Sequence, residues 1–308
     1  MGLFSRKKGA SVTLSPDGPY HPTDTITATV TVDEPLDKVS AASVELGYVN
    51  GFRYRWAGRA DAALNHDNSS LLTIGQVGTD YGSEKDTDEW VHVLAEPLPL
   101  IEGTLNAGQH RVQVRLPSWS PGSSKDVVRW QLRLDVERSG KNVRIETPVT
   151  VLIGPPDPLP ASADLPLIQK TRALNSTLDF EITTEKGAYK AGEEVRGVIA
   201  VVSPETPGRT ALVAGWFQRV QESHPVSKTI GSPTEAFIRP MTTFAKGVQF
   251  IAGQRMEFPF ALTLPTDLDP TTEAVHSSIN WFVQIKVEFS GATGGIERAE
   301  KGIVVYTG

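Results

Sequence analysis

The stretch Ala252-Gly-Gln-Arg-Met-Glu-Phe-Pro-Phe-Ala-Leu-Thr-Leu-Pro265 decides the fold, because its apolar residues alternate with polar ones until a Leu-Pro pair ends it. Such alternation is typical of a β-strand with one buried face. A second strand pattern follows, in which Ile279, Trp281 and Val283 begin an alternation that reaches Phe289. A shift of one residue would expose this whole apolar set, so its register is well determined. The sequence predicts that the two strands form a hairpin.

The same pattern occurs earlier in the chain. Ala107-Gly-Gln109 opens a strand, Leu116-Pro117 ends it, and Val128-Arg-Trp130 begins the next one. The tyrosine that precedes an early strand also occurs twice, as Tyr20 and Tyr189. The spacing between the copies changes along the chain, as expected for a duplication whose loops differ in length. The sequence therefore predicts a tandem repeat of one fold.

Length and composition agree with this interpretation. A chain of 308 residues is long for one β-sandwich and sufficient for two domains of ordinary size. The 27 glycines and 22 prolines favour many turns and few long helices. Because the apolar faces of the strands must be buried against another sheet, the sequence predicts an all-β protein of two tandem antiparallel immunoglobulin-like β-sandwiches.

The stretch Gly154-Pro-Pro-Asp-Pro-Leu-Pro160 marks the boundary between the domains, since a proline-rich segment forms an extended spacer. The predicted divisions are a basic tail at residues 1–9, a first sandwich at 10–153, a linker and lead-in at 154–175, and a second sandwich at 176–308. Trp130 and Trp281 alternate in register with aliphatic residues and are predicted to be buried. Pro259 cannot donate to a strand ladder, so its strand is expected at a sheet edge or a bulge.

Charge and cysteine content exclude several classes of function. A formal net charge of -6 and a pI near 5.6 provide no basic field for a phosphate backbone, so no nucleic acid partner is expected. The absence of cysteine excludes disulfides and thiolate chemistry and suits a reducing compartment. No apolar run approaches the roughly 20 residues that span a bilayer, and the first residues lack the apolar core of a signal peptide. We expect a cytoplasmic protein.

Four stretches together resemble the arrestin-like superfamily, which includes arrestins, the arrestin-fold retromer subunit and bacterial sporulation-control proteins. They are Tyr189-Lys-Ala-Gly-Glu-Glu-Val-Arg-Gly197, the stretch from Ala252 to Pro265, Asp269-Pro-Thr-Thr272, and Ser278-Ile-Asn-Trp-Phe-Val-Gln-Ile-Lys-Val287. The first half of the chain shows the same pattern in weaker form. The resemblance implies arrestin-like domains of the N- and C-type, joined by a short linker.

The same resemblance implies a non-enzymatic adaptor or scaffold that binds other proteins, often at the membrane surface. Such a protein could accept a partner strand at an exposed sheet edge, or bind through loops at the domain junction. The sequence holds no Pro-Pro-x-Tyr motif, which argues against recruitment of ubiquitin ligases. No motif for a catalytic residue, a cofactor or a zinc site is present, and none is predicted.

An acidic run lies at the end of a long surface excursion expected from Gly58 to Glu89. Its carboxylates are weak candidates for calcium ligands, since calcium prefers several oxygens. They are Asp80, Glu84, Asp86 and Asp88. The run lacks the order and the glycine of an EF-hand, so a solvated acidic loop is the simpler interpretation. The alternative function is therefore a β-sandwich protein that binds carbohydrate or Ca²⁺ through this loop.

Phe52, Tyr54 and Trp56 alternate with arginines and could form a contact surface for a protein partner. Alternation alone favours a strand with one face in the core.

The N-terminus offers a second candidate contact. Leu3 and Phe4, followed by Lys7 and Lys8, could touch an anionic membrane weakly and reversibly, although a short soluble tail explains them equally. Function is expected where the two copies differ, which includes the segment from Gln221 to Lys246.

Overall fold

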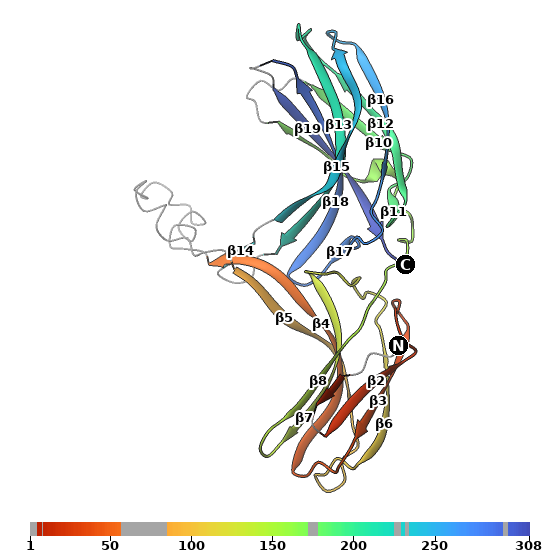
Figure 1. Cartoon of the computed structure of the whole chain (residues 1–308), viewed down its shortest axis with the longest axis vertical. Coiled ribbons are helices and arrows are strands. Elements are labelled where there is room, and N and C mark those ends of the chain that lie inside the picture. The colour runs from red at the N-terminus through yellow and green to blue at the C-terminus, as the bar shows by residue number, and fades with distance from the viewer. Residues whose placement is uncertain are drawn as a thin grey trace, which may run out of the picture. The chain divides into compact units, whose positions relative to one another are not determined.

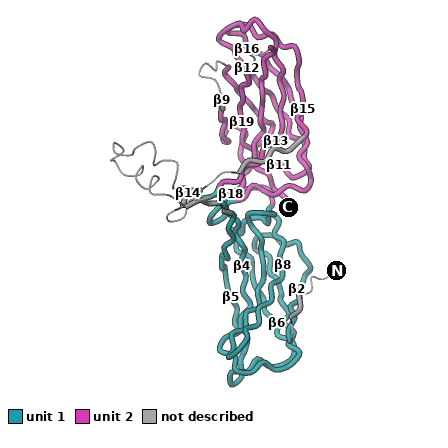
Figure 2. The backbone as a smooth tube through the Cα atoms, turned by 60° about the vertical axis from the view of Figure 1, so that its left-hand side comes forward, with its two compact units in different colours: residues 1–153, 223–232, 273–278 teal, residues 154–222, 233–272, 279–308 magenta. Residues whose placement is uncertain are grey.

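The computed structural model describes residues 5–7, 9–56, 85–171, 178–224, 229–231, 234–291 and 295–308. The chain forms two compact units, and the first passes into the second between Ile153 and Gly154. Unit 1 contains Met1–Ile153 together with two short segments of the second half of the chain, Ser223–Ser232 and Glu273–Ser278 (Figure 2). Unit 2 contains the remainder. Each unit is described on its own below.

Unit 1 is built from two sheets (Figure 1). The four-stranded sheet has the order β1 (Ser5–Lys7), β2 (Ala10–Ser15), β3 (Thr25–Val32) and β6 (Gly108–Arg115). The five-stranded sheet contains β14 (Thr229–Gly231), β4 (Val39–Trp56), β7 (Val128–Arg138) and β8 (Val143–Pro148), and β5 (Lys85–Pro97) pairs with β4. All strand pairs in both sheets are antiparallel.

Alternation places the core of unit 1. Along β3, Ile26, Ala28 and Val30 are fully buried while the threonines between them are exposed or half-buried. The facing sheet contributes Leu46 from β4 and Leu132 from β7, both fully buried. Each sheet thus hides one apolar face against the other, as in a β-sandwich.

Unit 2 repeats this plan. Its three-stranded sheet has the order β10 (Asp179–Thr184), β12 (Glu194–Val202) and β16 (Arg255–Thr263). Its seven-stranded sheet contains β11 (Ala188–Lys190), β19 (Ile296–Tyr306), β18 (Ser277–Phe289), β13 (Thr210–Ser223) and β15 (Thr234–Gln249), with β9 (Leu167–Thr171) on β19 and β17 (Thr272–Glu273) on β18. A single turn of 3-10 helix, η2, covers Ser162–Asp164. The predicted all-β fold is confirmed.

The repeated stretch is not a hairpin, and that prediction was wrong. In unit 1, β6 pairs with β3 while β7 pairs with β4 and β8, so the connection from β6 to β7 crosses between sheets. In unit 2, β16 and β18 likewise belong to different sheets. Leu116 and Leu264, at the strand ends, are 1% exposed, so each Leu-Pro pair anchors the start of the crossing in the core. Alternation within strands does not reveal which strands pair.

The two repeated tryptophans hold these crossings. The Trp130 indole Nε1–H donates to the Pro121 carbonyl at 2.8 Å, and that of Trp281 donates to the Asp269 carbonyl at 3.0 Å. Both side chains are 1% exposed, which confirms their predicted place in the core. Because a buried indole N–H needs an acceptor, each tryptophan fixes the loop that precedes its own strand.

Several predicted boundaries can be compared with the strands. Pro259 lies in β16, which pairs only with β12 among the described strands, so the predicted edge position is confirmed. Ser5–Lys7, assigned from sequence to a basic tail, forms β1 against β2. Leu167–Thr171, assigned to the linker and lead-in, forms β9 on β19. Within the described part of the chain, no helix is both long enough and apolar enough to cross a bilayer.

Candidate functional site

The aromatic run and the acidic run, predicted as separate features, are register partners in one pair of strands. Opposite Arg53 of β4 lies Asp86 of β5, and opposite Phe52 lies Thr87. We call this pair, residues 47–56 of β4 with residues 85–92 of β5, the arm. The arm therefore brings together most of the candidate residues that sequence alone identified.

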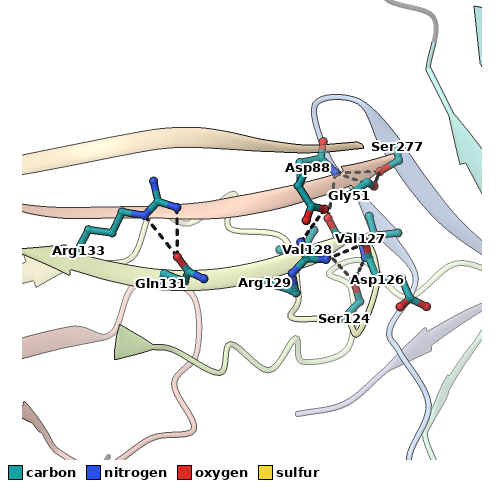
Figure 3. Close-up of polar contacts among 11 residues, drawn as sticks. Gly51, Asp88, Ser124, Asp126, Val127, Val128, Arg129, Gln131, Arg133 and Ser277 are labelled. Atoms are coloured by element: carbon teal, nitrogen blue, oxygen red, sulfur yellow. Dashed lines mark hydrogen bonds and ion pairs between the residues drawn. The ribbon is translucent and has the colours of Figure 1, made fainter. Parts of the chain in front are cut away.

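The acidic run differs from its prediction, because residues 85–89 belong to a strand instead of a loop. The side chain of Arg53 donates to Asp86 from Nε at 2.8 Å and from one terminal nitrogen at 3.3 Å. Arg129 of β7 contacts Asp88 at 2.6 Å (Figure 3). Paired arginines compensate these carboxylates, which lets an acidic segment enter a sheet. The hydrogen bond from Arg53 lowers the pKa of Asp86 below its usual value.

These ion pairs bear on the candidate calcium ligands. Asp86 and Asp88 each face an arginine, so their oxygens are already engaged. Asp80 and Glu84 lie outside the described residues. Across the described ranges, no group of three or more His, Asp or Glu side chains is arranged to hold a metal ion.

The three aromatic candidates lie along β4. Phe52 is 5% exposed, and its ring centroid is 4.8 Å from that of His276. Tyr54 and Trp56 are opposite Gly231 and Thr229 of β14. Only their backbone is described.

The candidate membrane residues are at the other end of the chain. Lys7 is in β1, opposite Ala10, and its side chain is not described. Leu3, Phe4 and Lys8 lie outside the described residues. Membrane contact through these four residues stays a prediction.

One edge of β4 is completed by residues from three distant parts of the chain. On this side β7 pairs with β4 only as far as Asn50, which is opposite Val128. Beyond it, the Gly51 N–H donates to the Val127 carbonyl at 3.0 Å, and the Arg53 N–H donates to the Ser223 hydroxyl at 2.8 Å. Strand β14 then pairs with Tyr54 to Trp56. We call the backbone of residues 51–56 on this side the covered edge.

A buried amide lies at the start of the covered edge. Asn50 has no exposed surface, and its Nδ2 donates to the Val127 carbonyl at 2.9 Å and to the Ser277 hydroxyl at 2.8 Å. Its Oδ1 accepts the backbone N–H of His276 at 2.7 Å. The Ser277 hydroxyl in turn donates to the Gly51 carbonyl at 2.7 Å (Figure 3). Asn50 thus joins β4, the start of β7 and the segment Glu273–Ser278 through satisfied buried hydrogen bonds.

His276 adds an ionic contact to this cluster. Its ring Nε2 is 3.0 Å from a carboxylate oxygen of Glu89, which is opposite Asn50 on β5. His224 contributes a further link, since its backbone N–H donates to the His276 carbonyl at 2.8 Å. Residues of β5 and of both second-half segments therefore meet around one buried asparagine.

Two glycines of β4 allow close approach on the outer face of the arm. A Cβ at Gly51 would be 2.0 Å from the Asp126 carbonyl oxygen. A Cβ at Gly47 would be 2.4 Å from the Val91 carbonyl oxygen and 2.6 Å from the Trp90 ring. The guanidinium of Arg133 lies 3.4 Å from the centroid of the Trp90 ring on that face. Trp90 thus fills the space above a residue without a side chain and is held there by a cation–π contact.

The outer edge of β5 differs from the covered edge. Within the described part of the chain, β5 pairs only with β4. It is 13 residues long and holds no proline before Pro97. Donors on this edge belong to alternate residues, and the bond from the Leu98 N–H to the Ala42 carbonyl shows that even-numbered residues of β4 face β5. Following the register, Asp88, Trp90 and His92 then direct their N–H groups away from β4.

Sequence reasoning missed Asn50, Ser223, His276 and Ser277. Only Asn50 carried a signal, because it interrupts the inward alternation of Val44, Leu46 and Tyr48 in β4. A polar residue at an inward position must find partners, so such an interruption marks a buried hydrogen-bond site.

Comparisons with known proteins add little to this geometry. No family model matches the chain, and no curated protein matches it. Among solved structures, the sporulation control protein Spo0M from Bacillus subtilis is similar at 20% identity and a TM-score of 0.33. The match covers 44% of this chain and 51% of that protein, about half its length. Spo0M belongs to one of the groups that the sequence resembles, but a likeness of this size supports no conclusion about function.

Proposed function

We propose that the protein is a non-enzymatic cytoplasmic adaptor that binds other proteins by accepting an extended partner segment along the outer edge of β5. The observation that carries the proposal is the length and openness of this edge. Natural proteins usually shorten an edge strand, cover it, or interrupt it with proline, because its free N–H and C=O groups pair with other chains. Strand β16 carries such a proline at Pro259, whereas β5 has none before its last residue.

The side chains of β5 support recognition on both faces of an added strand. Val91 and Leu94 are half-buried on the side of Tyr48 and Leu46, so an apolar residue of the partner would extend the core there. Trp90 and Asp88 lie on the other face beside Arg133 and Arg129. In strand addition, backbone bonds supply affinity and alternate side chains supply specificity. The expected partner segment is therefore extended, with apolar and polar residues in alternation.

The decisive variant is His92→Pro. It removes a donor from the outer edge and leaves the ladder to β4 intact, so the fold is retained while a partner strand loses one bond. His92→Ala is the matched control, since it changes the same exposed side chain and keeps the N–H. In native affinity purification, proteins retained by wild type and His92→Ala should be lost from His92→Pro.

A site-directed crosslink locates the contact. Because the chain has no cysteine, His92→Cys carries a maleimide photocrosslinker at one position only. Crosslinking from residue 92, but not from Arg144→Cys on the exposed surface of β8, is the expected result. Equal retention of all partners by His92→Pro, or equal crosslinking from both positions, contradicts binding at this edge.

A further inference from the structure

The covered edge of β4 is closed by a discontinuous set of contacts. Upstream, β7 pairs with β4 in unbroken register from Ala41 to Asn50. From Gly51 onward the partners change at almost every residue. The Gly51 groups use the Val127 carbonyl and the Ser277 hydroxyl, and the Arg53 N–H uses the Ser223 hydroxyl. A regular strand therefore has an irregular neighbour on this side.

The last part of the cover is β14, a strand of only three residues. Ile230 is opposite Arg55, the next residue after Gly51 and Arg53 whose backbone groups face this edge. Each such hydrogen bond contributes about 1 kcal/mol net, so a three-residue strand is held weakly on its own. A segment fixed by few bonds belongs to the low-stability part of a fold and opens locally.

We propose that the covered edge is a second strand-acceptor site, which Ser223–Ser232 occupies in the free protein and which an extended segment of a partner protein occupies in its place. A continuous partner strand could satisfy Gly51, Arg53 and Arg55 with one regular ladder. The present cover reaches the same groups only with two hydroxyls and a short strand. The segment Ser223–Ser232 is thus a built-in competitor for the partner.

The two faces of β4 define the chemistry of the partner segment. On the inner face, the buried Phe52 ring lies beside His276, so a residue placed next to Phe52 should be apolar or aromatic. On the outer face, Arg53 is paired with Asp86, so residues next to it should be polar. Prolines are excluded where the segment must donate to β4. The expected ligand is an extended peptide with one apolar residue between polar neighbours.

This inference rests on the proposed function in one respect only, namely that the protein binds extended segments. It concerns the opposite edge of the arm, so the two sites can fail separately. His92→Pro, which alters the outer edge of β5, should leave binding at the covered edge unchanged.

The test uses the full chain and a labelled peptide with its own sequence, Ser-His-Pro-Val-Ser-Lys-Thr-Ile-Gly-Ser, from residues 223–232. In the variant Ile230→Pro the built-in strand loses its central N–H, so the covered edge opens more often. Fluorescence anisotropy should show that Ile230→Pro binds the peptide about tenfold or more tightly than wild type, because the built-in segment no longer reduces the competent fraction. Ile230→Ala, which keeps the N–H, is the matched control.

A disulfide provides the opposite state. Arg55→Cys with Ile230→Cys joins two register partners in a chain that has no other cysteine. Neighbouring antiparallel residues lie within the Cα separation that a disulfide spans. The oxidised protein should not bind the peptide, and reduction should restore wild-type binding. This pair also keeps the test valid if Ile230→Pro folds poorly.

Three outcomes overturn the inference. Ile230→Pro may bind the peptide no more tightly than wild type, or the oxidised protein may bind it as well as the reduced protein does. Binding confined to a dimeric fraction in sedimentation would show that a second copy exchanges this segment. If His92→Pro loses its protein partners while peptide binding follows the expected pattern, both proposed edges stand.

Discussion

The backbone N–H of Arg53 donates to the side-chain hydroxyl of Ser223, 170 residues further along the chain, at 2.8 Å. A strand backbone would normally find its partner in a neighbouring strand, and here a single serine takes that role. The contact marks the point where the five-stranded sheet of unit 1 stops being closed by its own strands. Both edges of the arm therefore depend on what lies beside them, which makes them measurable.

Replacing Asn50 should strongly destabilise unit 1. Asn50→Ala removes three hydrogen bonds and leaves the His276 N–H and the Val127 carbonyl with fewer partners in a buried site. Each buried group left unpaired costs about 1–3 kcal/mol, so we expect a loss of about 2–4 kcal/mol. Urea unfolding measures it. Asn50→Asp keeps the acceptor for His276 and loses the donors, and an effect of Asn50→Ala below that of Asn50→Asp would contradict this assignment.

A methyl group at Gly51 should be poorly tolerated. The added Cβ would be 2.0 Å from the Asp126 carbonyl oxygen, which is far inside normal contact. The loop before β7 must move, and overpacking of this kind costs about 1–3 kcal/mol. Gly295→Ala is a suitable control, because a Cβ there meets nothing within 4 Å. Thermal unfolding of both variants should show a lower Tm for Gly51→Ala only; equal Tm values would contradict the close approach.

The pKa of Asp86 should depend on Arg53. In the folded protein the hydrogen bond from Arg53 lowers this pKa, so the unfolded state binds the proton more tightly. The resulting stabilisation is present above the ordinary pKa of an aspartate and is lost as the pH falls through the lowered pKa. Since the Asp86 side chain is 78% exposed, it amounts to less than about 1 kcal/mol.

Arg53→Ala should therefore raise the pKa of Asp86 towards its ordinary value, as NMR titration of the carboxyl carbon can show. Arg129→Ala is the control, since Arg129 contacts Asp88 instead. A rise in the pKa of Asp86 that is equally large in both variants would show that the general field, and not the Arg53 contact, sets it.

Calcium should not stabilise the wild-type protein through Asp86 and Asp88. A calcium ion needs several uncommitted oxygens, and both carboxylates face arginines. The Tm in calcium should equal that in EDTA, and magnesium serves as the control ion. A rise in Tm that is specific for calcium and is abolished by Asp86→Asn would favour the alternative function as a calcium-binding protein.

The two repeated tryptophans should have matching roles. Trp130→Phe and Trp281→Phe each remove an indole donor from a loop carbonyl and leave most of the ring volume in place. Each should reduce stability by about 1–3 kcal/mol, through the lost hydrogen bond and the smaller ring. Denaturant unfolding followed by tryptophan fluorescence can test both, and a neutral effect in either unit would contradict the shared role.

The sequence by itself determined the strands, the duplication and the core. Period-two alternation is a local property, so it identified β3 over Thr25–Val32, the buried Trp130 and Trp281, and the edge position of Pro259. The same alternation could not show that β6 and β7 belong to different sheets, because each strand has the same pattern whichever neighbour it pairs with.

Only the tertiary structure decided what surrounds the arm. Arginines on β4 and β7 compensate the acidic run, and Ser223, β14 and Ser277 meet the edge of β4 from far along the chain. Such contacts depend on the hydrogen-bonding needs of backbone groups that every residue carries, so no residue type announces them. Asn50 is the exception, since a buried amide must be paired and therefore interrupts an apolar pattern that sequence can show.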